Sequence, residues 1–350
     1  MASFHTLHRF ARAGALTLAG TIALAGCSIS GTDAGSDTGT DAGSAAPQVI
    51  SQLEHVHGLG ADPLTGNTYA ATHHGVWLVP TGELPSSYLT GAPRSTVTHA
   101  EQIAGRAMDT MGFTVAAPGV LLASGHPDTA EHLDAAEPHA EAAEEAEDTD
   151  ATGNLDLAVP NLGLITSVDA AQTWTEVSLR GETDFHSLEA VALGSTSLRI
   201  YGYDSGTGTV SVSDDSGVTW SAGATLPLRD LAVDATNPDV VFATTSNGLA
   251  RSADAGRTFA LEADAPTLLL VDAVDADAGG GLVGIAPDGT VWRQVVDAAS
   301  WTQTGTFAGS PEALTFVGGD SPWILAANAE GIAASDDFGV SWTVLVSLLG

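Results

Sequence analysis

A short motif recurs along the chain from residue 167 onward and constrains the fold more than any other feature. It begins with serine, places an aspartate two positions later and ends on an aromatic residue. The four copies are SVDAAQTW (Ser167–Trp174), SDDSGVTW (Ser213–Trp220), SADAGRTF (Ser252–Phe259) and SDDFGVSW (Ser335–Trp342). A weaker copy ends at Trp301, so successive terminal aromatics lie 46, 39, 42 and 41 residues apart. A period of about 40 residues is typical of a four-stranded propeller blade.

Short alternating segments lie between the motif copies. NTYAATHHGVWLV, DVVFATTSNGLARS, GLVGIAPDGTVWR and WILAANAEGIAAS each read as a strand, a turn containing glycine and a second strand. Five such units precede the C-terminus, and residues from about 49 to 107 make a sixth without the motif. The sequence therefore predicts an all-β, six-bladed β-propeller, with seven blades as the alternative.

The motif itself is expected to be structural. Aspartate and glycine favour the tight turn of a hairpin, and the aromatic side chain can pack between blades. We therefore predict turn roles for the motif aspartates and packing roles for the tryptophans. The residues concerned are Asp169, Asp215, Asp254, Asp337, Trp174, Trp220 and Trp342.

The first 48 residues have the composition of an export signal and a tether. Arg9 and Arg12 precede a short apolar run, and Leu24-Ala25-Gly26-Cys27 resembles the lipobox of bacterial lipoproteins. Residues 1–26 are therefore a predicted lipoprotein signal peptide, with Cys27, the only cysteine, as the lipid attachment site. Residues 27–48 are small, polar and acidic and predict a flexible tether. We expect the propeller, residues 49–350, to lie at the outer face of the cell membrane.

The charge of the chain restricts its partners. A formal net charge of −33, with 43 acidic residues against 10 basic ones, repels nucleic acid and favours cations. The chain has no lysine, which excludes Schiff-base chemistry. Residues from about 129 to 154 add a predicted disordered insertion rich in acids and histidine. We expect a monomer that contacts the membrane only through its lipid.

Histidine is concentrated in the first three predicted blades. Four histidines lie between Glu54 and Trp77, and none follows His186. In a propeller the start of the first strand of a blade meets the end of its second strand at one rim. The corresponding positions of later blades hold Thr245 or Ser246, Pro287 and Ala329, so the repeat itself does not demand histidine.

These side chains predict a metal or ligand site on one rim. Alternation along a strand places His55 with His57 on one face, Asp109 with Met111, and Asp184 with His186. Imidazole with carboxylate suits Zn or Cu(II), and a thioether favours copper. The alternative for each histidine is a hydrogen-bonded side chain without a ligand. The candidates are His55, His57, His73, Asp109, Met111, His126, Asp128, Asp184 and His186.

The chain also resembles a known family. The repeated motif resembles the Asp-box of sialidases and other BNR-repeat propellers. The phrases H-x-H-G, A-T-H-H-G, D-T-M-G-F, S-G-H-P, P-N-L-G-L and L-R-G-E-T-D-F-H, in that order, resemble bacterial secreted or lipid-anchored Asp-box proteins labelled glycosyl hydrolase or exo-sialidase-like. The resemblance covers most of residues 55–190 and, more loosely, the blades that follow. It implies a propeller fold, and because the glycosyl hydrolase label rests largely on that fold, glycoside hydrolysis is an alternative function.

The residues of a sialidase are not found. Arg251 and Arg257 belong to a motif turn, and Tyr69 lies within a predicted strand, so neither an arginine cluster nor a tyrosine nucleophile is evident. A glycosidase acting on neutral sugars needs two carboxyl groups, and Asp109 with Asp184 is the candidate pair. A protein-binding scaffold is the third class of function, which would require an exposed apolar patch.

Overall fold

The computed structural model describes residues 53–82, 84, 95–128, 160–194, 197–296, 300–319 and 321–348. The chain divides into two compact units, 1–46 and 47–350, and every described residue belongs to the second. The predicted signal peptide, lipid attachment site and tether fall outside the described residues, as does the whole predicted insertion at 129–154.

The described residues form six four-stranded antiparallel sheets, each made of strands consecutive in the chain. Blade 1 comprises β1 (Val56–Ala61), β2 (Thr68–Thr72), β3 (Gly75–Val79) and β4 (Glu101–Gln102). Blade 2 comprises β5 (Asp109–Ala117), β6 (Val120–His126), β7 (Leu164–Ser167) and β8 (Thr175–Ser178). Blade 3 comprises β9 (Phe185–Leu193), β10 (Ser197–Asp204), β11 (Thr209–Ser213) and β12 (Ser221–Thr225).

The remaining blades follow the same order. Blade 4 comprises β13 (Asp230–Val233), β14 (Val241–Thr245), β15 (Gly248–Ser252) and β16 (Ala260–Leu261). Blade 5 comprises β17 (Leu270–Ala273), the 3₁₀ helix η2 (Ala276–Ala278), β18 (Leu282–Ile285), β19 (Thr290–Gln294) and β20 (Thr302–Thr306). Blade 6 comprises β21 (Pro311–Val317), β22 (Trp323–Asn328), β23 (Gly331–Ser335) and β24 (Thr343–Ser347). The prediction of six blades is confirmed, and the alternative of seven is wrong.

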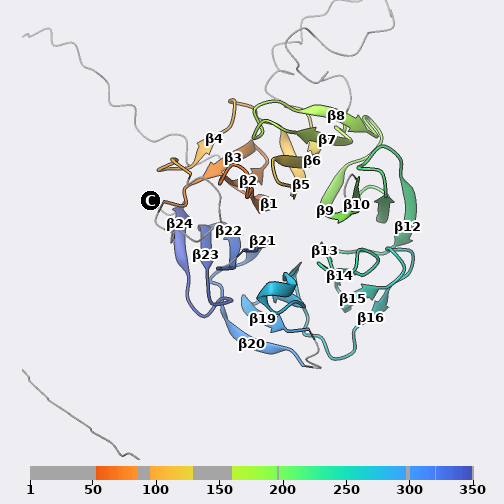
Figure 1. Cartoon of the computed structure of the whole chain (residues 1–350), viewed down its shortest axis with the longest axis vertical. Helices are drawn as coiled ribbons and strands as arrows, with labels where there is room; N and C mark the ends of the chain where they lie inside the picture. Colours follow the sequence, from red (N-terminus) through yellow and green to blue (C-terminus); the bar gives the residue numbers. More distant parts are fainter. Residues whose placement is uncertain are drawn as a thin grey trace, which may run out of the picture. The chain divides into compact units, whose positions relative to one another are not determined.

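The blades close into a ring around a central axis (Figure 1). The innermost strand of each blade contacts the innermost strands of its two neighbours, and β1 packs against both β5 and β21. Apolar side chains fill the space between blades. Leu59 and Trp77 of blade 1 share one buried cluster with Val317 and Trp323 of blade 6, so hydrophobic packing joins the first blade to the last.

Three carboxylates add hydrogen bonds between the innermost strands. Asp230 Oδ2 accepts from the Val271 backbone N–H at 3.0 Å, and Asp272 Oδ2 accepts from the Phe316 N–H at 2.6 Å. Glu312 Oε2 accepts from the Val56 N–H at 3.1 Å. The first two bonds join blades 4, 5 and 6 in turn, and the third joins blade 6 to blade 1.

The repeated motif forms the turn between the third and fourth strands of its blade. In the copy between β11 and β12, Asp215 Oδ1 accepts from the Ser213 hydroxyl and the Thr219 N–H, each at 2.8 Å. The Thr219 hydroxyl donates to Asp215 Oδ2 at 2.6 Å, and the Gly217 N–H donates to Ser213 Oγ at 2.8 Å. The bonds to Asp215, led by the one from the Thr219 hydroxyl, lower the pKa of Asp215 to about 2. The same contacts recur around Asp169, Asp254 and Asp337.

The aromatic residues that end the motif lie between blades. Trp174 is 4% exposed and belongs to the apolar cluster between blades 1 and 2. Trp220 Nε1 donates to Ser178 Oγ of the preceding blade at 2.9 Å, and Trp342 Nε1 donates to the Thr306 carbonyl at 3.1 Å. Because the motif turns join strands three and four, they lie at the rim opposite the start of each innermost strand.

Candidate metal centre on the rim of blades 1–3

The innermost strands of blades 1, 2, 3 and 6 each open with a β-bulge. In β1 the pairing passes from Val56↔Thr72 directly to Gly58↔Ala71, which leaves His57 as the extra residue. The same shift leaves Met111 extra in β5, His186 in β9 and Glu312 in β21. A bulge re-aims the side chain that it carries and is common beside functional sites. Strict alternation, from which we expected pairs of side chains to share a face, is therefore broken at these positions.

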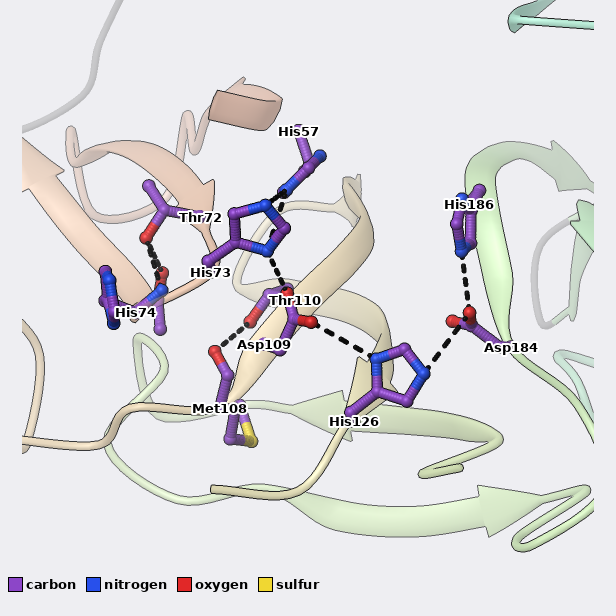
Figure 2. A network of polar contacts seen from close by, with 11 residues as sticks. His57, Thr72, His73, His74, Met108, Asp109, Thr110, His126, Asp184 and His186 are labelled. Carbon is purple, nitrogen blue, oxygen red and sulfur yellow. Dashed lines mark hydrogen bonds and ion pairs between the residues drawn. The ribbon is translucent and has the colours of Figure 1, made fainter. Parts of the chain in front are cut away.

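A continuous series of polar contacts joins three blades at this rim (Figure 2). His57 Nε2 lies 3.3 Å from His73 Nε2, and His73 Nδ1 lies 2.6 Å from Asp109 Oδ1. Asp109 Oδ2 is 3.3 Å from His126 Nδ1, so the two oxygens of one carboxylate contact different histidines. On its other side His126 Nε2 is 3.5 Å from Asp184 Oδ2, which is 2.6 Å from His186 Nε2.

One part of this network has the spacing of a metal site. His57, His73 and Asp109 each offer a ligand atom, and these atoms all lie within 4.8 Å of one another. All three side chains are partly exposed, which leaves a route for an ion from solvent. Burial, followed by the neighbouring His73, lowers the pKa of His57 to about 4. His57 is therefore neutral near pH 7, and neutral imidazole is the form that binds metals.

Two glycines permit the close approach of strands at the site. Gly75 follows the turn that carries His73, with φ of 82°, and a Cβ there would lie 2.0 Å from the Arg106 carbonyl oxygen. Gly125 precedes His126 with φ of 144°, and its Cβ would lie 1.9 Å from the Asp109 carbonyl oxygen. A side chain at Gly75 would displace His73, and one at Gly125 would displace His126. The atoms that it would meet are backbone carbonyl oxygens, which cannot move aside as the end of a flexible side chain can.

Some predicted site residues lie at the edge of the network or outside it. His55 precedes β1 with φ of 55°; its side chain is 64% exposed and packs edge-on against His73, 5.4 Å between ring centroids. Asp128 Oδ2 accepts a hydrogen bond from the Ala107 N–H at 3.1 Å, a backbone contact beside the site. Met111 is half-buried at its bulge and makes none of the contacts that join the described histidines and aspartates of this rim. His74 points away from His73 (Figure 2).

Two charged residues at the same rim were missed from the sequence. Glu312 occupies the bulge of β21, and its Oε1 lies 4.0 Å from His55 Nδ1. Arg229 directly precedes β13, and its Nη2 donates to the Glu312 carbonyl oxygen at 2.7 Å. Both come from blades without histidine, so no cluster of ligand residues marked them. The signal that could have found them is their position, immediately before or at the start of an innermost strand.

A central cavity of about 370 Å³ lies within the ring. His57, His186, Arg229 and Glu312 are among its lining residues. Four further acids line it, Glu189, Asp230, Asp272 and Asp275. Burial raises the pKa of Asp230 to about 6. Burial also raises the pKa of Asp272 and of Glu189, and for Glu189 the charges of Asp272 and Asp230 add to the effect. A cavity with this lining favours protons or cations over anions.

The two predicted carboxyl groups of a glycosidase are placed on either side of one ring. Asp109 and Asp184 both contact His126, one at each nitrogen. Each also contacts a second histidine at 2.6 Å, His73 for Asp109 and His186 for Asp184. The structure thus brings the pair together, but as partners of imidazoles.

Among the described residues, no helix has the length and apolar character needed to cross a membrane.

Comparisons with known proteins return structural likeness only. No family model matches the sequence, and no curated protein matches it. Among solved structures, the chain is similar to an ancestral GH74 enzyme, with a TM-score of 0.44 and 14% identity over 80% of this chain and 36% of that one. It is similar to YCF48 bound to D1 peptide, with a TM-score of 0.44 and 14% identity over 84% of this chain and 81% of that one. It is also similar to the GH74 xyloglucanase of Xanthomonas campestris, with a TM-score of 0.46 and 15% identity over 84% of this chain and 38% of that one. The chain thus spans little more than a third of either GH74 protein.

Proposed function

We propose that this chain is a lipid-anchored, extracytoplasmic binding protein that holds a transition metal ion, Zn or Cu(II), on the rim of blades 1–3. The observation that carries the proposal is the convergence of His57, His73 and Asp109, whose ligand atoms lie within 4.8 Å of one another. The anchor is proposed from the lipobox-like sequence at Cys27.

The donor set supports a transition metal over calcium or magnesium. Two imidazoles and one carboxylate match the ligands of zinc sites that retain an open position, whereas calcium and magnesium prefer oxygen donors alone. His57 and His73 come from blade 1 and Asp109 from blade 2, so the ion would also join two blades. His57 would bind without first losing a proton, because its lowered pKa of about 4 keeps it neutral at pH 7.

The contacts of the site are made by nitrogen and oxygen atoms, which fits zinc and Cu(II) equally. The thioether that favoured copper belonged to Met111, and the bulge at that residue removes the argument that it must share a face with Asp109. We therefore keep both ions in the proposal and give neither precedence.

Glycoside hydrolysis is the weaker candidate. A glycosidase requires one carboxylic acid that donates a proton to the leaving group. Both candidate carboxylates, Asp109 and Asp184, contact two histidines each, so imidazole rings occupy the oxygens that would have to face a sugar.

Titration calorimetry on metal-free protein purified without a histidine tag tests the proposal. We expect Zn or Cu(II) to bind more tightly than about 10 μM, which corresponds to roughly −7 kcal/mol. His73→Gln should weaken binding at least about tenfold, since it removes a ligand. His74→Gln is the matched control, because the neighbouring ring on the same turn points away from the site. Equal losses in both variants, or no binding to the wild type, would overturn the proposal.

A further inference from the structure

His126 and Asp109 lie directly opposite each other in the first two strands of blade 2. The register pairs Asp109, which opens β5, with His126, which ends β6. Side chains of directly opposed residues in antiparallel strands are close neighbours. His126 Nδ1 accordingly lies 3.3 Å from Asp109 Oδ2, whereas His73 contacts the other oxygen, Oδ1, at 2.6 Å. The pairing of two strands within one sheet therefore sets the contact between this imidazole and the carboxylate.

The ring of His126 is held at both of its nitrogens. Its Nε2 lies 3.5 Å from Oδ2 of Asp184, which immediately precedes β9 of blade 3. Asp184 Oδ2 in turn contacts His186 Nε2 at 2.6 Å. An imidazolium donates from both nitrogens, so the two carboxylate contacts of His126 need no bound ion. A ring fixed at both ends has little freedom to turn away from Asp109.

His126 lies outside the group that has the spacing of a metal site. Among the described residues, the group whose ligand atoms all lie within 4.8 Å of one another consists of His57, His73 and Asp109. Asp109 is the member that touches His126, because one of its oxygens faces His73 and the other faces His126. Any effect of His126 on an ion at this group therefore passes through the carboxylate of Asp109.

We propose that His126 is a positioning residue for the metal site. Its Nδ1–H donates to Asp109 Oδ2 and holds the carboxylate with Oδ1 toward the ion. The inference rests on the proposed function, which places the ion at His57, His73 and Asp109. A carboxylate can turn about its terminal bond, and fixing it before the ion arrives reduces the freedom that is lost on binding. Hydrogen-bond partners of metal ligands typically contribute about 10–100-fold to affinity.

Zinc titration of the full chain with three uncharged replacements tests this role. His126→Asn keeps an amide N–H near the place of Nδ1, His126→Gln moves it toward the place of Nε2, and His126→Leu removes it. We expect His126→Leu to bind zinc about 10–100-fold more weakly than the wild type. His126→Asn should recover most of that loss, and His126→Gln should recover less, because its donor no longer faces Asp109. Differences among the three variants cannot come from charge, since none of them carries one.

His99 provides the matched control. Its side chain is exposed and forms its ion pair with Glu101, away from this network. His99→Asn, His99→Gln and His99→Leu should therefore bind zinc as tightly as the wild type. X-ray absorption at the zinc edge, with one zinc ion per chain, adds a count of imidazole ligands. We expect the same count, from His57 and His73, in the wild type and in every variant of His126.

The outcomes separate this inference from the proposed function. Equal affinities of His126→Asn and His126→Leu would overturn the inference, because a donor at the place of Nδ1 would then have no effect. A count of imidazoles that falls in His126→Leu would overturn it too, since His126 would be a ligand. If circular dichroism shows that His126→Leu does not fold, the comparison of His126→Asn with His126→Gln decides.

The wild type and His73→Gln complete the comparison. If His73→Gln loses affinity while the three variants of His126 bind alike, the inference fails and the proposed function stands. If the wild type binds no zinc, both fail together.

Discussion

His73 and Asp109 lie 36 residues apart in the chain, and their side chains meet at 2.6 Å across the boundary between blades 1 and 2. The contact exists because His73 begins the turn after β2 and Asp109 opens β5. Adjacent blades of a propeller bring such positions to one rim whatever their side chains. The histidine and the aspartate are therefore properties of this site and not requirements of the fold.

The proposed lipid anchor depends on one residue. Cys27→Ala should move the protein from the membrane fraction to the soluble extracytoplasmic fraction, because no other cysteine is present to carry the lipid. Fractionation followed by immunoblotting measures the change. A Ser28→Ala variant, altered at the next position, should remain with the membrane. Retention of the Cys27→Ala protein in the membrane would show that something else attaches it.

The motif tryptophans should matter for stability and not for metal binding. Trp174→Ala removes a side chain that is 4% exposed, and we expect it to lower the free energy of unfolding by about 3–5 kcal/mol. Urea denaturation gives the stability, and zinc titration of the folded protein gives the affinity. Asp215→Ala should also destabilise the fold, because it removes the acceptor of three hydrogen bonds in its turn. A variant that loses zinc binding at unchanged stability would contradict the structural role.

The acids of the central cavity should make stability depend on pH. Burial raises the pKa of Asp230 from 3.8 to about 6, so the fold favours its neutral form. The stability that this preference supplies is fully present below about pH 4 and is lost as the pH rises through about 6. Between pH 4 and 7 the wild type should therefore lose up to about 3 kcal/mol relative to Asp230→Asn, which has no charge to bury.

Urea denaturation at several pH values compares the two proteins. The charges that face Asp230 are those of Arg229, Glu189 and Asp272. Burial also raises the pKa values of Glu189 and Asp272, so the difference between the two proteins is the quantity to follow. Asp288→Asn is the control, because hydrogen bonds to Thr290 lower the pKa of this exposed aspartate. Its stability relative to the wild type should stay level over the same range. Parallel curves for the wild type and Asp230→Asn would mean that Asp230 is not held neutral.

The sequence predicts the architecture well because the repeat is periodic. The spacing of the motif fixes the length of each blade. A strand paired one residue out of register would turn its alternating apolar side chains toward solvent. The site is only partly predictable. His57, His73, Asp109, His126 and Asp184 were placed on one rim from their positions in the blades.

The bulges were not predictable, because one extra residue in a strand leaves no mark in the pattern of apolar residues. They alter the aim of Met111 and His186 and bring Glu312 to the rim. Glu312 and Arg229 were missed because their neighbours in sequence contain no ligand residues. The contacts of His126 depend on which of its nitrogens faces which carboxylate, and only the three-dimensional arrangement supplies that.

Anomalous X-ray diffraction from crystals grown with zinc, recorded on both sides of the zinc absorption edge, tests the central claim most directly. The account predicts a strong anomalous peak bound by His57, His73 and Asp109, with metal–ligand distances of about 2.0–2.2 Å. Crystals that contain zinc elsewhere on the chain, with no peak between His57, His73 and Asp109, would contradict it.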